Sequence, residues 1–544
     1  MGSYAFGFDF GTLSCRGIAI DLETGQVAAT AEEKYAHGVI NGKMYHADIP
    51  LQKDWNLQDP MDWLFCICQI SKRMLKDGNI RPEEVKSIGT DFTSCTLLPV
   101  KKDGTPLCEL AELRDKPNAW PKLWKHHGAQ KYAEEIEAYA KEHTTWLKDY
   151  FGGAVSSEWV FPKLLQVLRE NPEIYDAADY FMEAVDYIVM ALTGRVTRVN
   201  CFWVKGQGYP DPEFLKAIDP GLTDVTETKL AGEILTVGDP AGHLTEDMAA
   251  RMGLTTEAVV AAGHSDGAVA GCGAGVTESG SMILVMGTST CHQMMYKDYH
   301  AFEGLCSIAA DGMVPGLYGY ESGQPATGDI FQWFADTGVP ERYYREAEEK
   351  KQSILQYLGE LAAKIEPGTT GLVALDWFNG NRSILSNYNL SGLIVGLTLD
   401  TRTEEIYRTL VEANIFGSKR ILDNYEENGV PISYIYAVGG IARKSPWIMQ
   451  MCADAFGKEV IVPLVDNVPA HGAAVCGAVA LGKEGKGEGF ATFKEATEVM
   501  IPKDRQVYRP DAEKTKAYAK VYEAYKKLYD MFGKDDSFMK NLRK

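Results

Sequence analysis

The chain has 544 residues, of which 45% are hydrophobic and 24% are charged, so it is an ordinary globular sequence that is too long for a single hydrophobic core. We therefore expect two large domains, or three. The formal net charge of −20 argues against nucleic acid and against an anionic membrane as partners, because both bind through local positive charge. It does not argue against ATP, which loops and a metal ion can hold.

Cysteine usage and hydropathy predict a protein of the reducing cytoplasm. Eleven cysteines in a chain of this length do not form a disulfide scaffold. Cys66 and Cys68 form a CxC pair, yet no second Cys or His pair stands at zinc spacing. No run of 18 apolar residues is present, and the first residues lack a charged-then-apolar signal region. We expect no membrane association.

Residues 4–21, YAFGFDFGTLSCRGIAID, predict two short strands joined by a turn of small and hydroxyl residues. Apolar residues alternate with small or polar ones up to Asp9, which is the period-two pattern of a strand. Gly11, Thr12 and Ser14 offer backbone N–H groups and hydroxyls that can hold an anion. A carboxylate at Asp9 would repel a phosphate unless a divalent cation such as Mg²⁺ lies between them. The alternative is an ordinary hairpin with a polar turn.

Apolar residues at helical spacing predict a helix over residues 60–76. Its inner side carries Met61, Leu64, Cys68 and Leu75. The helix predicted over residues 129–143 is rich in Glu and Lys, which is typical of a solvated face. Further helices are predicted over residues 156–170, 179–194, 404–428 and 511–532.

The strand predicted over residues 85–91 ends in Asp91, which Thr93 and Ser94 follow. Ligands of α/β sheets collect at the carboxyl ends of the strands, so Asp91, Thr93 and Ser94 are candidates to face a site. The alternative is that Thr93 and Ser94 only cap the loop, and without further support this is the simpler interpretation.

Residues 116–128, KPNAWPKLWKHHG, combine two Trp, two His and two Pro. Aromatic faces that alternate with polar groups suit a sugar, whose apolar edge packs on an indole ring while its hydroxyls form hydrogen bonds. A metal site at His126 and His127 is disfavoured, because adjacent residues of a helix face different ways.

Residues 200–209, NCFWVKGQGY, place one lysine, Lys205, among aromatic residues and glycines. Lys205 either donates a hydrogen bond to a substrate hydroxyl or phosphate, or it is an exposed loop cation. Most loop lysines are of the second kind, so its role depends on outside support.

Residues 259–275, VVAAGHSDGAVAGCGAG, predict a buried strand that leads directly into a helix of very small residues. Asp266 stands at the junction, where it is either the N-cap of the helix or a general base directed into a cleft. The two roles are compatible, since a carboxylate at a strand end can accept N–H groups and still face a ligand. The small residues either let the helix approach another backbone closely or leave space for a ligand.

The strand and turn of the first residues recur at residues 281–291, SMILVMGTSTC, where Gly287 and Thr288 again follow an apolar strand. Two such turns, about half a chain apart, suggest a duplicated fold with one phosphate loop in each half. This arrangement resembles the actin-like ATPase fold of sugar kinases, hexokinases and large heat-shock chaperones.

Three later stretches of the second half have candidate ligand contacts. Glu321 lies between aromatic residues and glycines, and the helix that starts at Gly328 would admit a flat ligand near its backbone. Residues 375–382, LDWFNGNR, predict a strand with a Gly-Asn turn. Gly439 and Gly440 follow an apolar strand and would permit close contact with an adenine or ribose, or they form a simple tight turn.

Together these motifs closely resemble the FGGY family of carbohydrate kinases and, within it, the L-ribulokinases. The resemblance runs from residue 4 to about residue 482, nearly the whole chain. The phosphate turns and the double glycine are shared by sugar kinases in general. The more specific runs are HADIP at residues 46–50, NAWPKLWKHH at 118–127, SSEW at 156–159, GTSTC at 287–291, ESGQPATGDI from Glu321, LDWFNG from Leu375 and GGIARK from Gly439.

The resemblance implies an α/β fold of two actin-like (ribonuclease H-like) domains with a central cleft. The N-terminal domain, residues 1–261, would hold the sugar and the first phosphate turn, and the C-terminal domain, residues 262–544, would hold ATP and end in a closing helix. The implied activity is the phosphorylation of L-ribulose to L-ribulose 5-phosphate in L-arabinose catabolism, with ATP and Mg²⁺, and a homodimer is allowed. The alternatives are an FGGY kinase for another ketopentose or pentitol (ribitol, D-ribulose or L-xylulose) and a non-catalytic actin-like nucleotide switch.

The same resemblance implies roles for individual residues. Asp266 would be the general base, and Asp9 would orient Mg²⁺ through water. The sugar would contact Ser94, Lys205, Asp266 and Glu321. The nucleotide would be held by Gly11, Thr12, Ser14, Arg16, Gly287, Thr288, Gly328, Gly440 and Lys444. Relatives usually carry Ala or Gly where Ser94 stands, so its hydroxyl would retune sugar selectivity.

Overall fold

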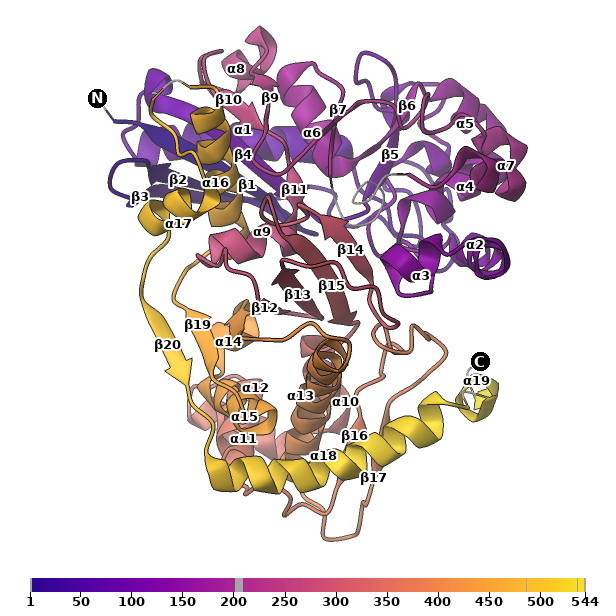
Figure 1. The fold of residues 1–544 in the computed structure, drawn as a ribbon, viewed down its shortest axis with the longest axis vertical. Helices are drawn as coiled ribbons and strands as arrows, with labels where there is room; N and C mark the ends of the chain where they lie inside the picture. The colour runs from indigo at the N-terminus through magenta and orange to yellow at the C-terminus, as the bar shows by residue number, and fades with distance from the viewer. Residues whose placement is uncertain (1, 201–208, 486, 536, 543–544) are drawn as a thin grey trace.

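The computed structural model describes residues 2–200, 209–485, 487–535 and 537–542, and it contains two large β-sheets, each covered by helices (Figure 1). We call the part built on the first sheet the N-terminal lobe and the part built on the second sheet the C-terminal lobe. Within the described residues, none of the helices has the length and apolar character that crossing a membrane requires. The ten cysteines in the described part of the chain all carry free thiols.

The first sheet has the strand order β3-β2-β1-β4-β10-β9, and β11 pairs with β4 beyond β10. Strands β1, β2 and β3 form an antiparallel meander, whereas β4 is parallel to β1, and β10 and β11 are parallel to β4. The strands are β1 (Tyr4–Phe10), β2 (Ser14–Asp21), β3 (Val27–Lys34), β4 (Val85–Phe92), β9 (Pro240–His243), β10 (Val259–Ala261) and β11 (His264–Ser265).

Helices and two small sheets complete the N-terminal lobe. The helices are α1 (Pro60–Asp77), α2 (Gln130–His143), α3 (Trp146–Phe151), α4 (Val160–Glu170), α5 (Pro172–Ala177), α6 (Ala184–Thr193), α7 (Pro212–Ile218), α8 (Glu246–Met252) and α9 (Asp266–Gly273). The small sheets pair β5 (Leu97–Val100) with β6 (Tyr180–Glu183) and β7 (Thr197–Val199) with β8 (Glu233–Leu235). Helices α1 and α6 share one apolar core with the phenylalanines of β1.

The second sheet repeats the plan of the first, with the order β14-β15-β13-β12-β18-β19-β20. Strands β12, β13 and β15 form the meander, β18 is parallel to β12, and β19 is parallel to β18. The strands are β12 (Ser281–Met286), β13 (Thr290–Tyr296), β14 (Ser307–Ala310), β15 (Tyr318–Gln324), β18 (Tyr434–Val438), β19 (Val460–Pro463) and β20 (Arg505–Tyr508). The duplication predicted from the two turns is therefore confirmed.

The helices of the second half are α10 (Gly328–Gly338), α11 (Glu341–Glu349), α12 (Ile354–Ala362), α13 (Thr403–Glu427), α14 (Gly440–Lys444), α15 (Pro446–Phe456), α16 (Val468–Lys483), α17 (Phe493–Met500), α18 (Ala512–Gly533) and α19 (Ser537–Leu542), with the short hairpin β16 (Val373–Leu375) and β17 (Leu393–Val395). In Figure 1, α18 runs along the end of the C-terminal lobe that lies away from the first sheet. Helix α16 instead lies beside β1 and β4.

Close packing of α16 explains the small residues on both sides of the contact. A methyl group on Gly7 would lie 2.0 Å from the Ala470 carbonyl oxygen, and one on Gly89 would lie 1.7 Å from the Ala473 carbonyl oxygen. At Gly273 in α9, it would lie 2.0 Å from a carbonyl oxygen of α16. Close backbone approach, the first of the two alternatives for these small residues, is therefore what the structure shows there. The division predicted at residue 261 stays a prediction, although β11 and α16 lie on the first sheet.

Three predicted helices differ from the structure, one of them only at its start, since the helix predicted over residues 156–170 begins at Val160. The helix predicted over residues 179–194 begins only at Ala184, because Tyr180–Glu183 forms strand β6 against β5, a partner that local periodicity does not reveal. In α1, Met61 is exposed and Leu75 only half-buried. The buried stripe is rotated toward Trp63, whose ring packs edge-on against Phe92 with centroids 4.9 Å apart.

The strand predicted over residues 375–382 is also wrong, since β16 ends at Leu375. The Asp376 carboxylate accepts hydrogen bonds from Gln324 Nε2 at 2.7 Å and from Tyr525 Oη at 2.9 Å. The backbone pairing of β16 with β17 therefore ends at Leu375, Asp376 is held by side-chain contacts instead, and the segment that follows is irregular.

Candidate active site

Three aspartates gather where parallel strands of the first sheet end. Asp9 lies directly opposite Asp91 in the pairing of β1 with β4, and His264 lies opposite Asp91 in the pairing of β11 with β4. Helix α9 begins immediately after β11 with Asp266. The carboxyl ends of parallel strands form the usual ligand edge of such a sheet. Asp91 therefore lies beside the predicted metal and base residues.

The pair Asp9 and Asp91 is buried and short of positive charge. Burial raises the pKa of Asp91, and the charges of Asp9 and Asp266 raise it further. Within the described residues, no N–H or alcohol group donates to Asp91; its carboxyl group shares a hydrogen bond with that of Asp9. Burial also raises the pKa of Asp9, whereas Arg16, with Nη1 3.0 Å from Asp9 Oδ2, lowers it. One arginine cannot balance the charge of two buried carboxylates, so a bound cation would be favoured here electrostatically.

Asp266 is held at the first turn of α9 and remains partly exposed. The Gly267 N–H donates a hydrogen bond to Asp266 Oδ1 at 2.7 Å. Burial raises the pKa of Asp266 to about 7, and the charge of Asp9 adds to the shift. Ser265 occupies the cap position without a side-chain bond to the helix, so Asp266 is the first helical residue and not the predicted N-cap. A partly exposed carboxylate with this pKa suits a general base at neutral pH.

Glu321 approaches the same place from the C-terminal lobe. It lies on β15 opposite Gln293 of β13, whose amide hydrogen-bonds to its carboxylate. A methyl group on Gly267 would lie 3.0 Å from Gln293 Nε2, so Gln293 joins Glu321 to the start of α9. Burial raises the pKa of Glu321 to about 7; Arg382 acts in the opposite direction, and the charge of Asp266 adds to the rise. The structure therefore brings two predicted sugar-site residues together from the two lobes.

Of the other predicted sugar-site residues, Ser94 lies in the loop that follows β4, and Lys205 lies outside the described residues. The loop is fixed just after Ser94, where the Cys95 N–H donates to Glu183 Oε1 at 3.3 Å. Ser94 is thus presented at the carboxyl end of β4, close along the chain to Asp91.

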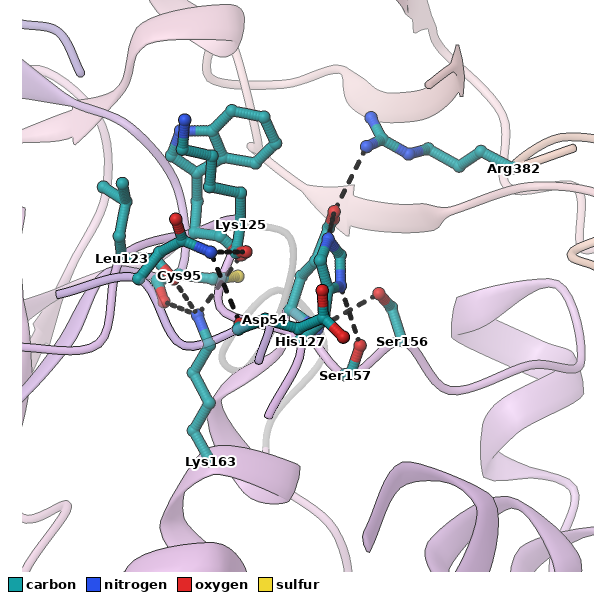
Figure 2. Close-up of polar contacts among 12 residues, drawn as sticks. Asp54, Cys95, Leu123, Lys125, His127, Ser156, Ser157, Lys163 and Arg382 are labelled. Carbon is teal, nitrogen blue, oxygen red and sulfur yellow. Dashed lines mark hydrogen bonds and ion pairs between the residues drawn. The ribbon is translucent and has the colours of Figure 1, made fainter. Parts of the chain in front are cut away.

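Lys163 is a buried lysine that the sequence analysis did not single out. Its Nζ donates to the carbonyl oxygens of Cys95 at 2.7 Å and Leu123 at 2.8 Å, so it ties together two loops beside the site (Figure 2). Burial lowers its pKa to about 8. The signal that could have found it is a single lysine inside the apolar run VFPKLLQVL of α4.

The first predicted phosphate turn is closed by a hydrogen bond from the Gly11 N–H to the Ser14 carbonyl oxygen at 3.0 Å. Thr12 Oγ1 accepts a bond from Trp124 Nε1 at 3.1 Å, which links the turn to the tryptophan-rich segment. Ser14 Oγ donates to Glu32 at 2.7 Å. The Ser14 hydroxyl is therefore engaged within the sheet, and Arg16 faces Asp9.

The second turn is built in a similar way and carries the other predicted nucleotide residues. Gly287 N–H donates to the Ser289 carbonyl oxygen at 2.9 Å, and Gly328 N–H donates to the Gly287 carbonyl oxygen at 3.0 Å. Gly439, at φ +96°, packs against the end of β12. A methyl group on Gly440 would meet nothing within 4 Å, so the space above it is open. The structure thus places Gly328 against Gly287 and Gly439 against Met286, the residue before Gly287, while Thr288 and Lys444 are exposed.

The donors present fit a metal ion that arrives with its own ligands. Within the described ranges, no three His, Cys, Asp or Glu side chains are arranged to hold a metal ion by themselves. Mg²⁺ bound to nucleotide phosphates keeps several waters and needs one or two protein carboxylates. The neighbouring side chains of Asp9 and Asp91, to which few donors are directed, supply such carboxylates.

Comparison with known proteins is consistent with this geometry. The chain is 42% identical to a ribulokinase of Shouchella clausii, over 100% of this chain and 98% of the relative. It is 41% identical to a ribulokinase of Geobacillus thermodenitrificans, over 99% and 96%. Among solved structures, a gluconate kinase from Lactobacillus acidophilus superposes with a TM-score of 0.80 at 18% identity, over 98% of this chain and 99% of that one. A ligand-bound xylulose kinase from the same species gives 0.78 at 18% identity, over 97% and 98%.

The structural neighbours show the two-domain actin-like fold, which confirms the predicted fold class. The N-terminal domain of the FGGY family of carbohydrate kinases matches residues 4–273, and the C-terminal domain of that family matches residues 282–481. The chain belongs to the FGGY family of carbohydrate kinases.

Proposed function

We propose that this protein is an ATP-dependent kinase that converts L-ribulose to L-ribulose 5-phosphate, with Asp266 as the general base. The observation that supports it most is the placement of Asp266 between the acidic pair of the first sheet and Glu321 of the other lobe. The choice of sugar is supported by the full-length relatives named ribulokinase at 41% and 42% identity.

The reaction joins the terminal hydroxyl of the sugar to the γ-phosphorus of ATP. As the new oxygen–phosphorus bond forms, the bond from the γ-phosphorus to the bridging oxygen breaks and ADP leaves. Asp266 accepts the proton of the hydroxyl, for which its pKa of about 7 is suitable. Because the transition state of phosphoryl transfer is loose, most of the acceleration comes from positioning and from neutralising charge.

The two turns would hold the phosphates from opposite lobes. The N–H groups of Gly11 and Gly287 close their own turns, so in this assignment the two glycines would let the phosphates approach closely, while the backbone N–H groups of Thr12 and Thr288 would donate to them and Ser14 would contribute its backbone. Arg16 would contact the terminal phosphates while paired with Asp9. Gly328, Gly440 and Lys444 would line the adenosine. Mg²⁺ brought by the nucleotide, held through water by Asp9, would neutralise charge on the phosphates.

Ser94, Glu321 and Lys205 are the remaining residues proposed for the sugar. Glu321, when ionised, accepts hydrogen bonds from sugar hydroxyls, and Ser94 can donate or accept one. A homodimer, a cytoplasmic location and the absence of nucleic-acid and membrane binding stay predictions of the sequence.

The test is ATP turnover with Mg²⁺, measured with and without L-ribulose and with a panel of D-ribulose, L-xylulose and ribitol. We expect turnover to be strongly stimulated by L-ribulose, with a kcat/KM at least about tenfold above that of the other sugars. A higher kcat/KM for another sugar would replace the substrate but keep the kinase. ATP hydrolysis that no sugar stimulates would instead indicate a nucleotide switch.

A further inference from the structure

Two segments without a role in the site meet in an ion pair between the lobes. Glu158 stands just before α4 in the N-terminal lobe, and Arg382 follows β16 in the C-terminal lobe. Arg382 Nη2 lies 3.3 Å from Glu158 Oε1 across the two lobes (Figure 2). The two side chains are only 13% and 14% exposed. A pair this well shielded is screened less than a surface pair.

Glu158 is fixed by its neighbours in the N-terminal lobe. Its backbone N–H donates to Ser156 Oγ at 3.2 Å. His127 Nε2 lies 3.8 Å from Glu158 Oε1, and His127 Nδ1 is 3.1 Å from Ser157 Oγ. The same Oε1 accepts the hydrogen bond from Arg382 Nη2 at 3.3 Å. The carboxylate is thus oriented toward the C-terminal lobe.

Arg382 is fixed just as firmly against β15. The next residue, Ser383, accepts a hydrogen bond at Oγ from the Gly323 N–H at 3.1 Å. A methyl group on Gly323 would lie 3.5 Å from both Cδ and Nη1 of Arg382, so the arginine lies across this glycine. Residues two apart on a strand share a face, and Gly323 is two residues from Glu321. Arg382 therefore lies on the face of β15 that carries Glu321.

The charges are arranged in a row from one lobe to the other. Glu158 and Glu321 are both acidic, and the charge of Glu158 raises the pKa of Glu321. The positive charge of Arg382 acts on both: Arg382 forms an ion pair with Glu158, and it lowers the pKa of Glu321. Tyr388 also hydrogen-bonds to the guanidinium. A planar guanidinium with five N–H donors can serve several acceptors at once, which an ammonium group does less well.

We propose that Arg382, held across the lobes by Glu158, is a positioning residue that orients Glu321 toward the hydroxyl groups of the bound sugar. The inference rests on the proposed function, because it takes Glu321 as part of the sugar site. Sugar hydroxyls donate more strongly to a charged carboxylate than to a neutral carboxyl group. Sugar affinity then depends on contact between the lobes at this point, whereas nucleotide affinity does not.

The test measures kcat and KM for the sugar and for ATP in Arg382→Met, Arg382→Lys and Glu158→Gln. Since a hydrogen bond to a charged group contributes about 1.5–3 kcal/mol, we expect the sugar KM to rise roughly 30-fold in Arg382→Met and about fivefold to tenfold in Glu158→Gln. Arg382→Lys retains the charge and should fall between parent and Arg382→Met. The ATP KM should stay within about twofold. The double variant Arg382→Met with Glu158→Gln should be no worse than Arg382→Met alone, because both changes remove one linked contact.

The matched control is Glu233→Gln, which removes one partner of an exposed pair with Arg195, 2.7 Å away in the same lobe as Glu158. It should leave both KM values unchanged. A sugar KM within about twofold of the parent in folded Arg382→Met, or equal rises in the sugar and ATP KM, would overturn the proposal. If Arg382→Met does not fold, the near-isosteric Glu158→Gln decides in the same way.

Failure of the proposed function is detected separately, by measuring ATP turnover of the parent protein with the panel of sugars. If the parent prefers another sugar of the panel, the variants are measured with that sugar, and the split between sugar KM and ATP KM decides. If no sugar stimulates the parent, Glu321 is not part of a sugar site and the inference falls with it.

Discussion

The two halves of the molecule share one arrangement of strands, which we call the frame, but they carry different residues at one pair of equivalent positions just before the turn. In the first sheet, Asp9 on β1 lies opposite Asp91 on β4. In the second sheet, Val285 on β12 lies opposite Val438 on β18. Asp9 and Val285 each stand two residues before the glycine of their turn. One frame thus presents an acidic pair in one half and an apolar pair in the other.

This difference separates residues that stabilise the sheet from residues that serve the reaction. The valine pair fits a buried central strand, as local propensity predicts. The aspartate pair is buried more completely than the valine pair, since Val285 is only partly buried, and it costs stability because its charge has few partners. A residue that weakens the fold at one copy of a duplicated position is expected where function requires it. We therefore expect chemistry to depend on the first half and nucleotide anchoring on the second.

The largest effect is expected at Asp266, which follows the first sheet and has no role in the frame of the second. General bases contribute about 10²–10⁴-fold, so Asp266→Asn should lose most of kcat while the sugar KM changes by less than about fivefold. Steady-state turnover with saturating ATP measures it. Unchanged turnover would remove Asp266 from the role of base and would leave the first half without its proposed chemistry.

The next effect compares the two equivalent positions directly. Asp9→Asn should reduce kcat about 10- to 100-fold and raise the Mg²⁺ concentration needed for half-maximal activity, as loss of a residue that orients a metal ion does. The matched control is Val285→Ala, at the equivalent position of the second half. It should leave the Mg²⁺ requirement unchanged. The same Mg²⁺ response in both variants would show that the halves do not differ as proposed.

A third prediction exchanges the residue types at two equivalent positions, Asp91 on β4 and Val438 on β18. Asp91→Val should raise the melting temperature at pH 8, because it removes a buried carboxyl group without donors. Val438→Asp should lower it, since an unpaired buried carboxylate costs several kcal/mol, on the order of 3. Differential scanning calorimetry measures both. A lower melting temperature for Asp91→Val would mean that Asp91 stabilises the fold and is not there for function alone.

The same comparison shows how far the sequence could be read. The turns, the duplication and helices such as α13 and α18 were predictable, because short strands, glycine turns and 3.6-residue periodicity are local signals. Asp266 and Glu321 could be named, but their meeting from two lobes depends on how the sheets are packed together. Long-range partners escaped prediction for the same reason. They include the pairing of β6 with β5, the position of α16 on the first sheet, and the contacts of Lys163 and Arg382.

The smallest effect is the pH dependence that Asp266 adds in the first half. The valine pair does not titrate, but the pKa of Glu321 in the second half is also raised to about 7, so only the difference between Asp266→Asn and the parent isolates Asp266. The pKa of Asp266 is raised to about 7, whereas an aspartate in the unfolded chain titrates near 4. Between these values the folded protein keeps a proton that the unfolded chain has lost. Asp266 therefore contributes stability below about pH 4, and this contribution is lost as the pH rises to about 7.

Asp266→Asn removes that loss. The difference in melting temperature between the variant and the parent should therefore shift in favour of the variant from pH 5 to pH 8. The corresponding gain in the free energy of unfolding is on the order of 2 kcal/mol, because one pKa unit corresponds to about 1.4 kcal/mol and partial exposure reduces the effect. In the parent, kcat/KM for the sugar should rise with pH up to about 7, as the base loses its proton. Val285→Ala should keep both pH profiles of the parent. A melting-temperature difference between Asp266→Asn and the parent that does not change with pH would show that Asp266 is ionised throughout, with Arg16 or another cation compensating its charge.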